Sequence, residues 1–204
     1  RDVTIRGGQI GPFDADKKNA NVYGGGQGRV WTVPSLNPAI YTNHANVDST
    51  SVVITDAASI EGSVFGGSSN GHVLGGTYVQ VTKGTNTPTI GKTGLAGEDG
   101  HVYGGGQGTT GSFTAGRVGG ITKVEISDGN ILGCVFGGGR MALTGVNELG
   151  KFNYFMPNTG NTVYDTVHHG TTYVEITGGV IGTNANNGND LLTSDQISGN
   201  VYGA

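Results

Sequence analysis

The sequence predicts an all-β fold, a parallel β-helix (β-solenoid) with polar loop insertions at its corners. Two observations carry this prediction. A phrase of valine, an aromatic residue and glycine occurs five times, beginning at Val22, Val64, Val102, Val135 and Val201. A short segment of alternating apolar and polar residues precedes each occurrence. Self-similarity of this kind is typical of repeat architectures, in which each unit buries its apolar face only against its neighbours.

The composition is compatible with an ordered repeat and excludes several other classes of protein. Glycine provides 41 of the 204 residues without a Gly-X-Y period, which excludes collagen. Recurrent valine and isoleucine pairs oppose low-complexity disorder. Charged residues make up 13% of the chain, its formal net charge is −4, and it has no basic stripe, so we expect no nucleic-acid partner. No stretch approaches the roughly 20 apolar residues of a membrane helix, so we expect no membrane span.

Each unit begins with a strand pattern of period two, which places alternate apolar side chains on one face. The pairs are Val3/Ile5, Val52/Ile54, Val79/Val81, Val124/Ile126 and Val174/Ile176. Units therefore start near residues 3, 52, 79, 124 and 174. We interpret residues 1–204 as one repeat domain of roughly five to eight coils, taken from a longer chain.

A turn rich in Gly, Asp or Asn follows each strand, and an isoleucine then returns to the core. The returning residues are Ile10, Ile60, Ile90, Ile131 and Ile181. Polar residues are inserted either between this isoleucine and the phrase or after the phrase, at 12–21, 29–50, 91–101, 140–171 and 182–200. Insertions confined to two places in the unit are typical of a repeat whose coils are constant and whose corners carry loops.

The phrase itself closes the unit. Its valines are expected to form an inward column, and its first glycines a second column in which bare backbone permits a sharp corner or a close approach. The glycines are Gly24, Gly66, Gly104, Gly137 and Gly203. The aromatic residue next to each valine must point to the opposite side. These aromatic residues are Tyr23, Phe65, Tyr103, Phe136 and Tyr202.

Two interpretations of the aromatic residues stay open. The rings either shield the outer face of the sheet beneath loops, or form an exposed strip that binds sugar rings. In the second case Tyr23, Tyr103 and Tyr202 would supply the rings, and Gln27 and Gln107 would supply amides that orient the sugar.

The repeat resembles a known family. Phrases of the form V-x-I-x-G-G-x-I-x-G-x-V-Y-G-G-G recur in very large, glycine-rich surface proteins of Bacteroidetes that are described as adhesin-like. Residues 174–182 (V-E-I-T-G-G-V-I-G) and 22–26 (V-Y-G-G-G) carry the likeness. The resemblance implies secretion, placement at the cell surface and a β-helical shaft, and it brings no catalytic residues with it.

Catalytic, metal and cofactor sites find little support in the sequence. Gln27 and Gln107 follow the glycines where a calcium-binding β-roll has aspartate, so that metal site is absent. Cys134 is the single cysteine and is predicted to be a small buried residue. Glu125 and Glu175 hold equivalent positions and should share an outer face, but Lys123 beside them indicates a solvated strand. We therefore expect no catalytic residues, no metal site and no cofactor.

The leading hypothesis is a non-enzymatic, extracellular structural or adhesive surface protein, whose shaft assembles end to end with copies of itself or with flanking repeats. Open sheet edges at the coil ends would make this contact. The first alternative is a glycan-binding module that uses the aromatic strip on surface glycans. The second alternative is a polysaccharide lyase or hydrolase built on a β-helix.

Overall fold

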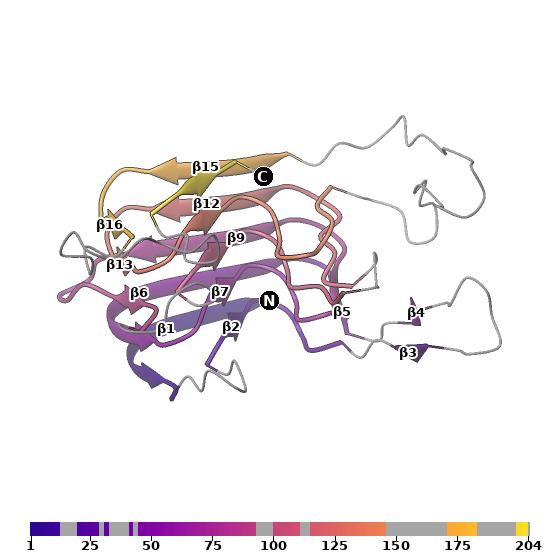
Figure 1. Cartoon of the computed structure of the whole chain (residues 1–204), viewed down its shortest axis with the longest axis horizontal. Coiled ribbons are helices and arrows are strands. Elements are labelled where there is room, and N and C mark those ends of the chain that lie inside the picture. The colour runs from indigo at the N-terminus through magenta and orange to yellow at the C-terminus, as the bar shows by residue number, and fades with distance from the viewer. Residues whose placement is uncertain are drawn as a thin grey trace, which may run out of the picture.

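The structure is a computed structural model that describes residues 1–12, 20–28, 31–32, 41–42, 45–92, 100–110, 115–145, 171–182 and 199–203. These residues form seventeen strands and no helix, so the all-β prediction is confirmed (Figure 1). Within the same ranges, no helix with the length and apolar character of a membrane span occurs. Most of the inserted corner residues lie outside the described ranges.

The larger sheet contains the strands that open the units. These are β1 (Asp2–Ile10), β6 (Thr50–Ile60), β9 (Thr77–Thr82), β12 (Thr122–Ile126) and β15 (Thr172–Ile176). They pair in parallel in the order β1, β6, β9, β12, β15 and lie one above the next in Figure 1. The first core valines of the five units are register partners throughout, from Val3 through Val52, Val79 and Val124 to Val174. The predicted strand alternation is therefore confirmed.

The sheet continues beyond the turn with the returning isoleucines. The strands β10 (Thr89–Ile90), β13 (Asn130–Ile131) and β16 (Val180–Ile181) pair in parallel with one another and with the end of β6. Ile60 is thereby in register with Ile10 and Ile90, and Ile131 with Ile90 and Ile181. The sheet thus curls around the turn instead of ending there.

A second parallel sheet is built from the five phrases. Its order is β17 (Val201–Tyr202), β14 (Val135–Phe136), β11 (Val102–Tyr103), β7 (Val64–Phe65) and β2 (Val22–Tyr23). Valine faces valine and aromatic faces aromatic at every step. Two further strand pairs complete the described chain. β5 (Asn46–Val47) runs parallel to β8 (His72–Val73), and β3 (Trp31–Thr32) is antiparallel to β4 (Tyr41–Thr42).

The core lies between the two large sheets and is almost purely valine and isoleucine. Its fully buried members come from the middle units, among them Val64, Val102 and Val135, which confirms the inward valines. Apolar residues of the first and fifth units are mostly partly buried, as Val3 and Val174 are, or exposed, because each has neighbours in the core on one side alone, although Val22 is buried. Burial of methyl groups in such columns contributes about 0.8 kcal/mol for each methylene removed from water.

The predicted glycine column is confirmed, and its cause is close approach of the backbone. A Cβ on Gly66 would lie 2.2 Å from the carbonyl oxygen of Gly104, and one on Gly104 would lie 2.3 Å from that of Gly137. Neither glycine is among those with positive φ in the described chain. Any side chain at these positions would therefore push two units apart, while glycine lets them stack.

A column of threonines that the sequence analysis missed ties the two sheets together. The hydroxyls of Thr50 and Thr77 donate to the carbonyl oxygens of Gly66 and Gly104 over 2.6 Å, and that of Thr122 donates to Gly137 over 2.5 Å. Thr172 donates to Gly203 in the same way. All four threonines stand two residues before the first core valine of their unit. The first three hydroxyls thus satisfy buried carbonyl groups at the crowded glycine corner, while the pair of Thr172 and Gly203 is exposed.

Candidate functional site

The aromatic rings of the phrases stack face to face along the whole body. Ring centroids are separated by 4.9 Å between Tyr23 and Phe65, 4.7 Å between Phe65 and Tyr103, 4.7 Å between Tyr103 and Phe136, and 4.8 Å between Phe136 and Tyr202. The planes of each pair differ by 12° or less. The spacing equals the distance between neighbouring strands, so the strand register itself brings the rings into contact.

The faces of the inner rings are covered. Phe65 is completely buried and Tyr103 is 7% exposed, whereas Tyr202 in the fifth unit is 37% exposed. The His101 imidazole also lies edge-on to Tyr103 and Phe136, with centroids 5.8 Å away. A sugar stacks on an open ring face. The geometry therefore favours the packing interpretation, and glycan binding by this column stays a prediction that concerns only the outer faces of its end rings, Tyr23 and Tyr202.

Of the two glutamines proposed to orient a sugar, only Gln107 contacts the aromatic column. The Tyr23 hydroxyl donates to the side-chain oxygen of Gln107, and the Asn21 amide donates to the same hydroxyl over 3.3 Å. Gln107 is therefore engaged by the aromatic column itself. Gln27 is exposed and joins Ser69 through a backbone bridge. The structure brings Tyr23 and Gln107 together, and it places Gln27 in a neighbouring stretch of backbone.

The residues that precede the phrase valines form a second polar column. The backbone N–H of Ser63 donates to Asn21 Oδ1 over 2.8 Å, that of His101 to Ser63 Oγ over 3.1 Å, and that of Cys134 to His101 Nδ1 over 2.9 Å. Cys134 is buried, as predicted, and burial raises the pKa of its thiol, while the backbone N–H of Asn200 bonds to it. The thiol thus continues a series of acceptors for corner N–H groups.

A cluster of polar side chains lies on the outer face of the larger sheet, on β9, β12 and β15. The Lys123 ammonium lies over the rings of Tyr78 and Tyr173, 5.8 Å and 5.4 Å from their centroids. It also forms an ion pair with Glu125, whose other oxygen accepts a hydrogen bond from the Tyr78 hydroxyl. Tyr173 donates over 3.4 Å to Glu175. Three neighbouring strands therefore supply one connected network.

These contacts set the protonation of the network. The hydrogen bond from Lys123, followed by that from Tyr78, holds the pKa of the Glu125 carboxyl below its ordinary value. Burial and the bond to Glu125 raise the pKa of Tyr78 to about 12. Glu125 is consequently ionised at neutral pH, which makes it a poor general acid.

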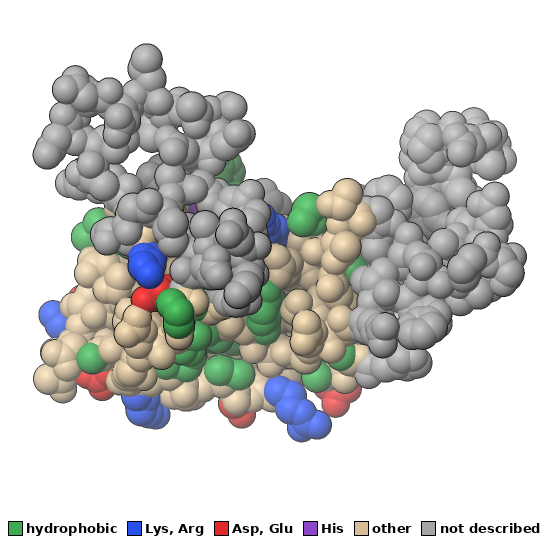
Figure 2. Space-filling view, turned by 60° about the horizontal axis from the view of Figure 1, so that its bottom comes forward, with side chains coloured by type: hydrophobic (Ala, Val, Ile, Leu, Met, Phe, Trp, Pro, Cys, Tyr) green, Lys and Arg blue, Asp and Glu red, His purple; other side chains and the backbone are tan. Residues whose placement is uncertain are grey.

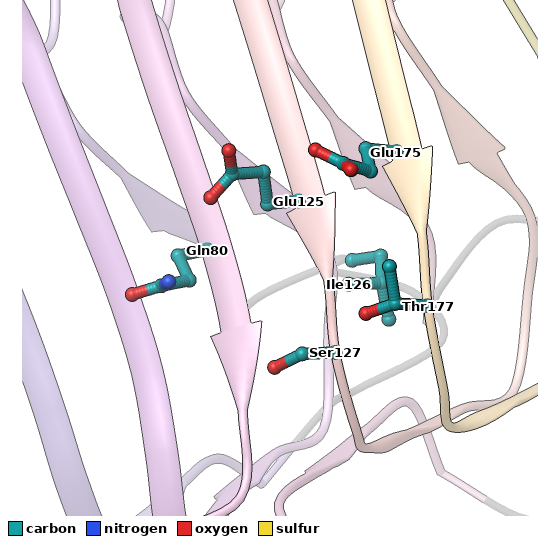
Figure 3. A pocket seen from close by; sticks show the side chains of 6 residues that line it. All are labelled: Gln80, Glu125, Ile126, Ser127, Glu175 and Thr177. Atoms are coloured by element: carbon teal, nitrogen blue, oxygen red, sulfur yellow. The ribbon is translucent and has the colours of Figure 1, made fainter.

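A shallow depression of about 190 Å³ opens beside this network. It is lined by Gln80, Glu125, Ile126, Ser127, Glu175 and Thr177. Figure 3 shows the carboxyl groups of Glu125 and Glu175 side by side on neighbouring strands, and the two residues are register partners. The prediction that these glutamates share an outer face is confirmed. Gln80, their register neighbour on β9, was not predicted, although its place between core Val79 and Val81 signals the same face.

Metal-binding clusters do not occur in the described ranges, which hold no group of three or more His, Cys, Asp or Glu side chains suited to an ion. No protein-family model matches the chain, and no curated protein or solved structure is similar to it.

Burial of the aromatic column predicts a late phenol titration. Desolvation raises the pKa of Tyr103 to about 12, from an ordinary value of 10.0. The folded protein keeps this proton more tightly than the unfolded chain, so its stabilising effect is complete below pH 10 and is lost as the pH rises through about 12. We expect an absorbance titration to detect tyrosine hydroxyls that ionise near pH 12. The Tyr103→Phe variant should have one fewer such hydroxyl. It should keep the fold, because Phe65 and Phe136 hold the equivalent positions. If the variant had as many hydroxyls that ionise near pH 12 as the parent, Tyr103 would not be one of them.

Proposed function

We propose that the chain is a segment of a parallel β-helix that serves as a non-enzymatic shaft in an extracellular, adhesin-like surface protein. One observation carries the proposal. Valine, aromatic ring and glycine recur in register in all five units, so each unit is a template for the next. A body of this kind lengthens by adding units, and its stability is approximately a sum over neighbouring pairs.

The end faces support continuation by a further unit of the same repeat. In the fifth unit Ile176, Val180 and Val201 are exposed, although their equivalents in the fourth unit are buried or half-buried. Figure 2 shows the face nearest β1, where hydrophobic side chains lie together in the middle and most charged side chains lie along the lower edge. Open edges of this kind pair readily with another strand. The occupant we propose is another unit of this repeat, in the same longer chain or in a second copy.

The enzymatic alternative is less well supported. A glycosidase with two carboxylates keeps one of them protonated as the general acid. Here Lys123 and Tyr78 hold the pKa of Glu125 below its ordinary value, which opposes that role. The carboxylates also lie on an open strand face, beside a shallow depression that water reaches.

The proposal is tested with antibodies raised against the purified chain and with polysaccharide degradation assays. We expect the antibodies to label intact cells that produce the protein, and we expect the chain to release no reducing ends or unsaturated products from acidic and neutral polysaccharides. Labelling that requires permeabilised cells would overturn the surface assignment. Turnover abolished by Glu125→Gln would overturn the non-enzymatic role.

A further inference from the structure

We propose that the depression between β9, β12 and β15 is a saccharide-binding site that takes one neutral pyranose residue of a glycan. It lies on the larger sheet, whereas the aromatic column belongs to the second sheet, and it is lined by different residues. The inference goes beyond the shaft role and does not depend on it. The site would be present whatever the function of the chain, because it depends only on the outer face of β9, β12 and β15.

Side chains at the rim of the depression keep unused hydrogen-bonding capacity. Both oxygens of Glu125 are engaged by Lys123 and Tyr78. Within the described residues, the Gln80 amide has no partner, and Glu175 has only the long contact of 3.4 Å from Tyr173. The rim thus offers an amide donor, an amide acceptor and a carboxylate acceptor, with the Thr177 hydroxyl beside them. A sugar hydroxyl both donates and accepts, so this mixture suits a polyol.

The ligands available at the rim favour a neutral sugar over a metal ion. Calcium takes six to eight oxygen ligands, with carboxylates prominent among them. Glu125 is already neutralised by an ion pair, and the same ammonium of Lys123 lies 5.4 Å from the Tyr173 ring, next to Glu175. Among the described residues at the rim, Glu175 is then the one carboxylate without an ion pair, and one such group is a poor ligand set for calcium. A neutral polyol needs no cluster of carboxylates, and it gains charge-assisted hydrogen bonds to Glu175.

The size and openness of the depression suit a single sugar ring. The volume of about 190 Å³ matches one sugar ring more closely than an oligosaccharide. The depression is open on its outer side, so the neighbouring residues of a glycan could extend into solvent. Gln80, Glu125 and Glu175 belong to paired strands, which hold a site more rigidly than loops do, and Ser127 and Thr177 follow directly after β12 and β15.

The test is a titration of the ¹⁵N-labelled chain with three probes, the methyl glycosides of mannose, galactose and glucose, followed by amide chemical shifts. We expect at least one glycoside to shift the amides of Gln80, Ser127 and Thr177 while those of Tyr23 and Tyr202 stay unchanged. Glu175→Ala and Gln80→Ala should each weaken this binding about tenfold. Thr4→Ala is the matched control, because Thr4 occupies the same outer row of the sheet away from the depression, and it should bind normally.

Every other outcome contradicts the site. Shifts with none of the three glycosides would overturn it, as would shifts that survive both substitutions. If calcium chloride alone caused these shifts, the ligand of the site would be a cation and not a sugar. Glycoside shifts at Tyr23 or Tyr202 alone would place the sugar on the ends of the aromatic column. The readout requires no cell-surface placement, so its failure is distinct from failure of the shaft proposal.

Discussion

Replacing Gly104 with alanine is expected to destabilise the protein by about 4 kcal/mol or more, enough to prevent folding. The new Cβ would lie 2.3 Å from the carbonyl oxygen of Gly137 and 3.1 Å from the Cβ of Thr122. The first of these atoms is backbone in a neighbouring unit, so the clash cannot be relieved by a change of rotamer. Thermal unfolding followed by circular dichroism measures the loss.

The control for this prediction belongs to the same column. A Cβ on Gly203 meets nothing within 4 Å, so Gly203→Ala should melt close to the parent. If both variants melt alike, close approach between units is not the reason for glycine, and the stacked arrangement of the phrases is wrong.

Val135→Asp should also abolish folding. Val135 is completely buried, in register with Val102 and Val201 and surrounded by the methyl groups of the core. An ionised carboxylate without a partner in such a place costs several kcal/mol, a large part of the stability of an ordinary domain. We expect insoluble or unfolded protein, measured by recovery in the soluble fraction and by circular dichroism.

The matched substitution is Val201→Asp in the fifth unit. Val201 is 47% exposed, so its carboxylate would keep contact with water, and the loss of stability should be much smaller. A soluble Val135→Asp variant with unchanged melting would show that the valine does not point inward.

The strands and their register were predictable because the signals for them are local and repeated. Alternation of Val124 and Ile126 around Lys123 and Glu125 identifies the inner and outer faces of one strand. The recurring phrase then aligns the units, since identical side chains stack best on one another. The same logic predicted that Glu125 and Glu175 share a face, which their register confirms.

The polar contacts were not predictable because their partners are distant in sequence. Thr77 bonds to a carbonyl 27 residues away and His101 accepts from Cys134, 33 residues away, and neither pair can be identified before the register is known. The depression depends likewise on three strands meeting at Gln80, Glu125 and Glu175. The alternation of residues along a strand shows on which side of the sheet a ring lies, but not what covers that side. The exposure of the aromatic rings was therefore not predictable.

Distances between spin labels along one outer row test whether the five units stack in sequence order and parallel register. Asp2, Ser51, Tyr78, Lys123 and Tyr173 are successive register partners. One label at position 2 is combined with a second label at each of the other positions in turn. The natural thiol is removed by Cys134→Ser, which the fold should accept because Ser63 holds the equivalent place in another unit. Each step should add about 4.8 Å, so that the Tyr173 pair lies about 19 Å apart. Distances that do not rise in the order 51, 78, 123, 173 would contradict the stack.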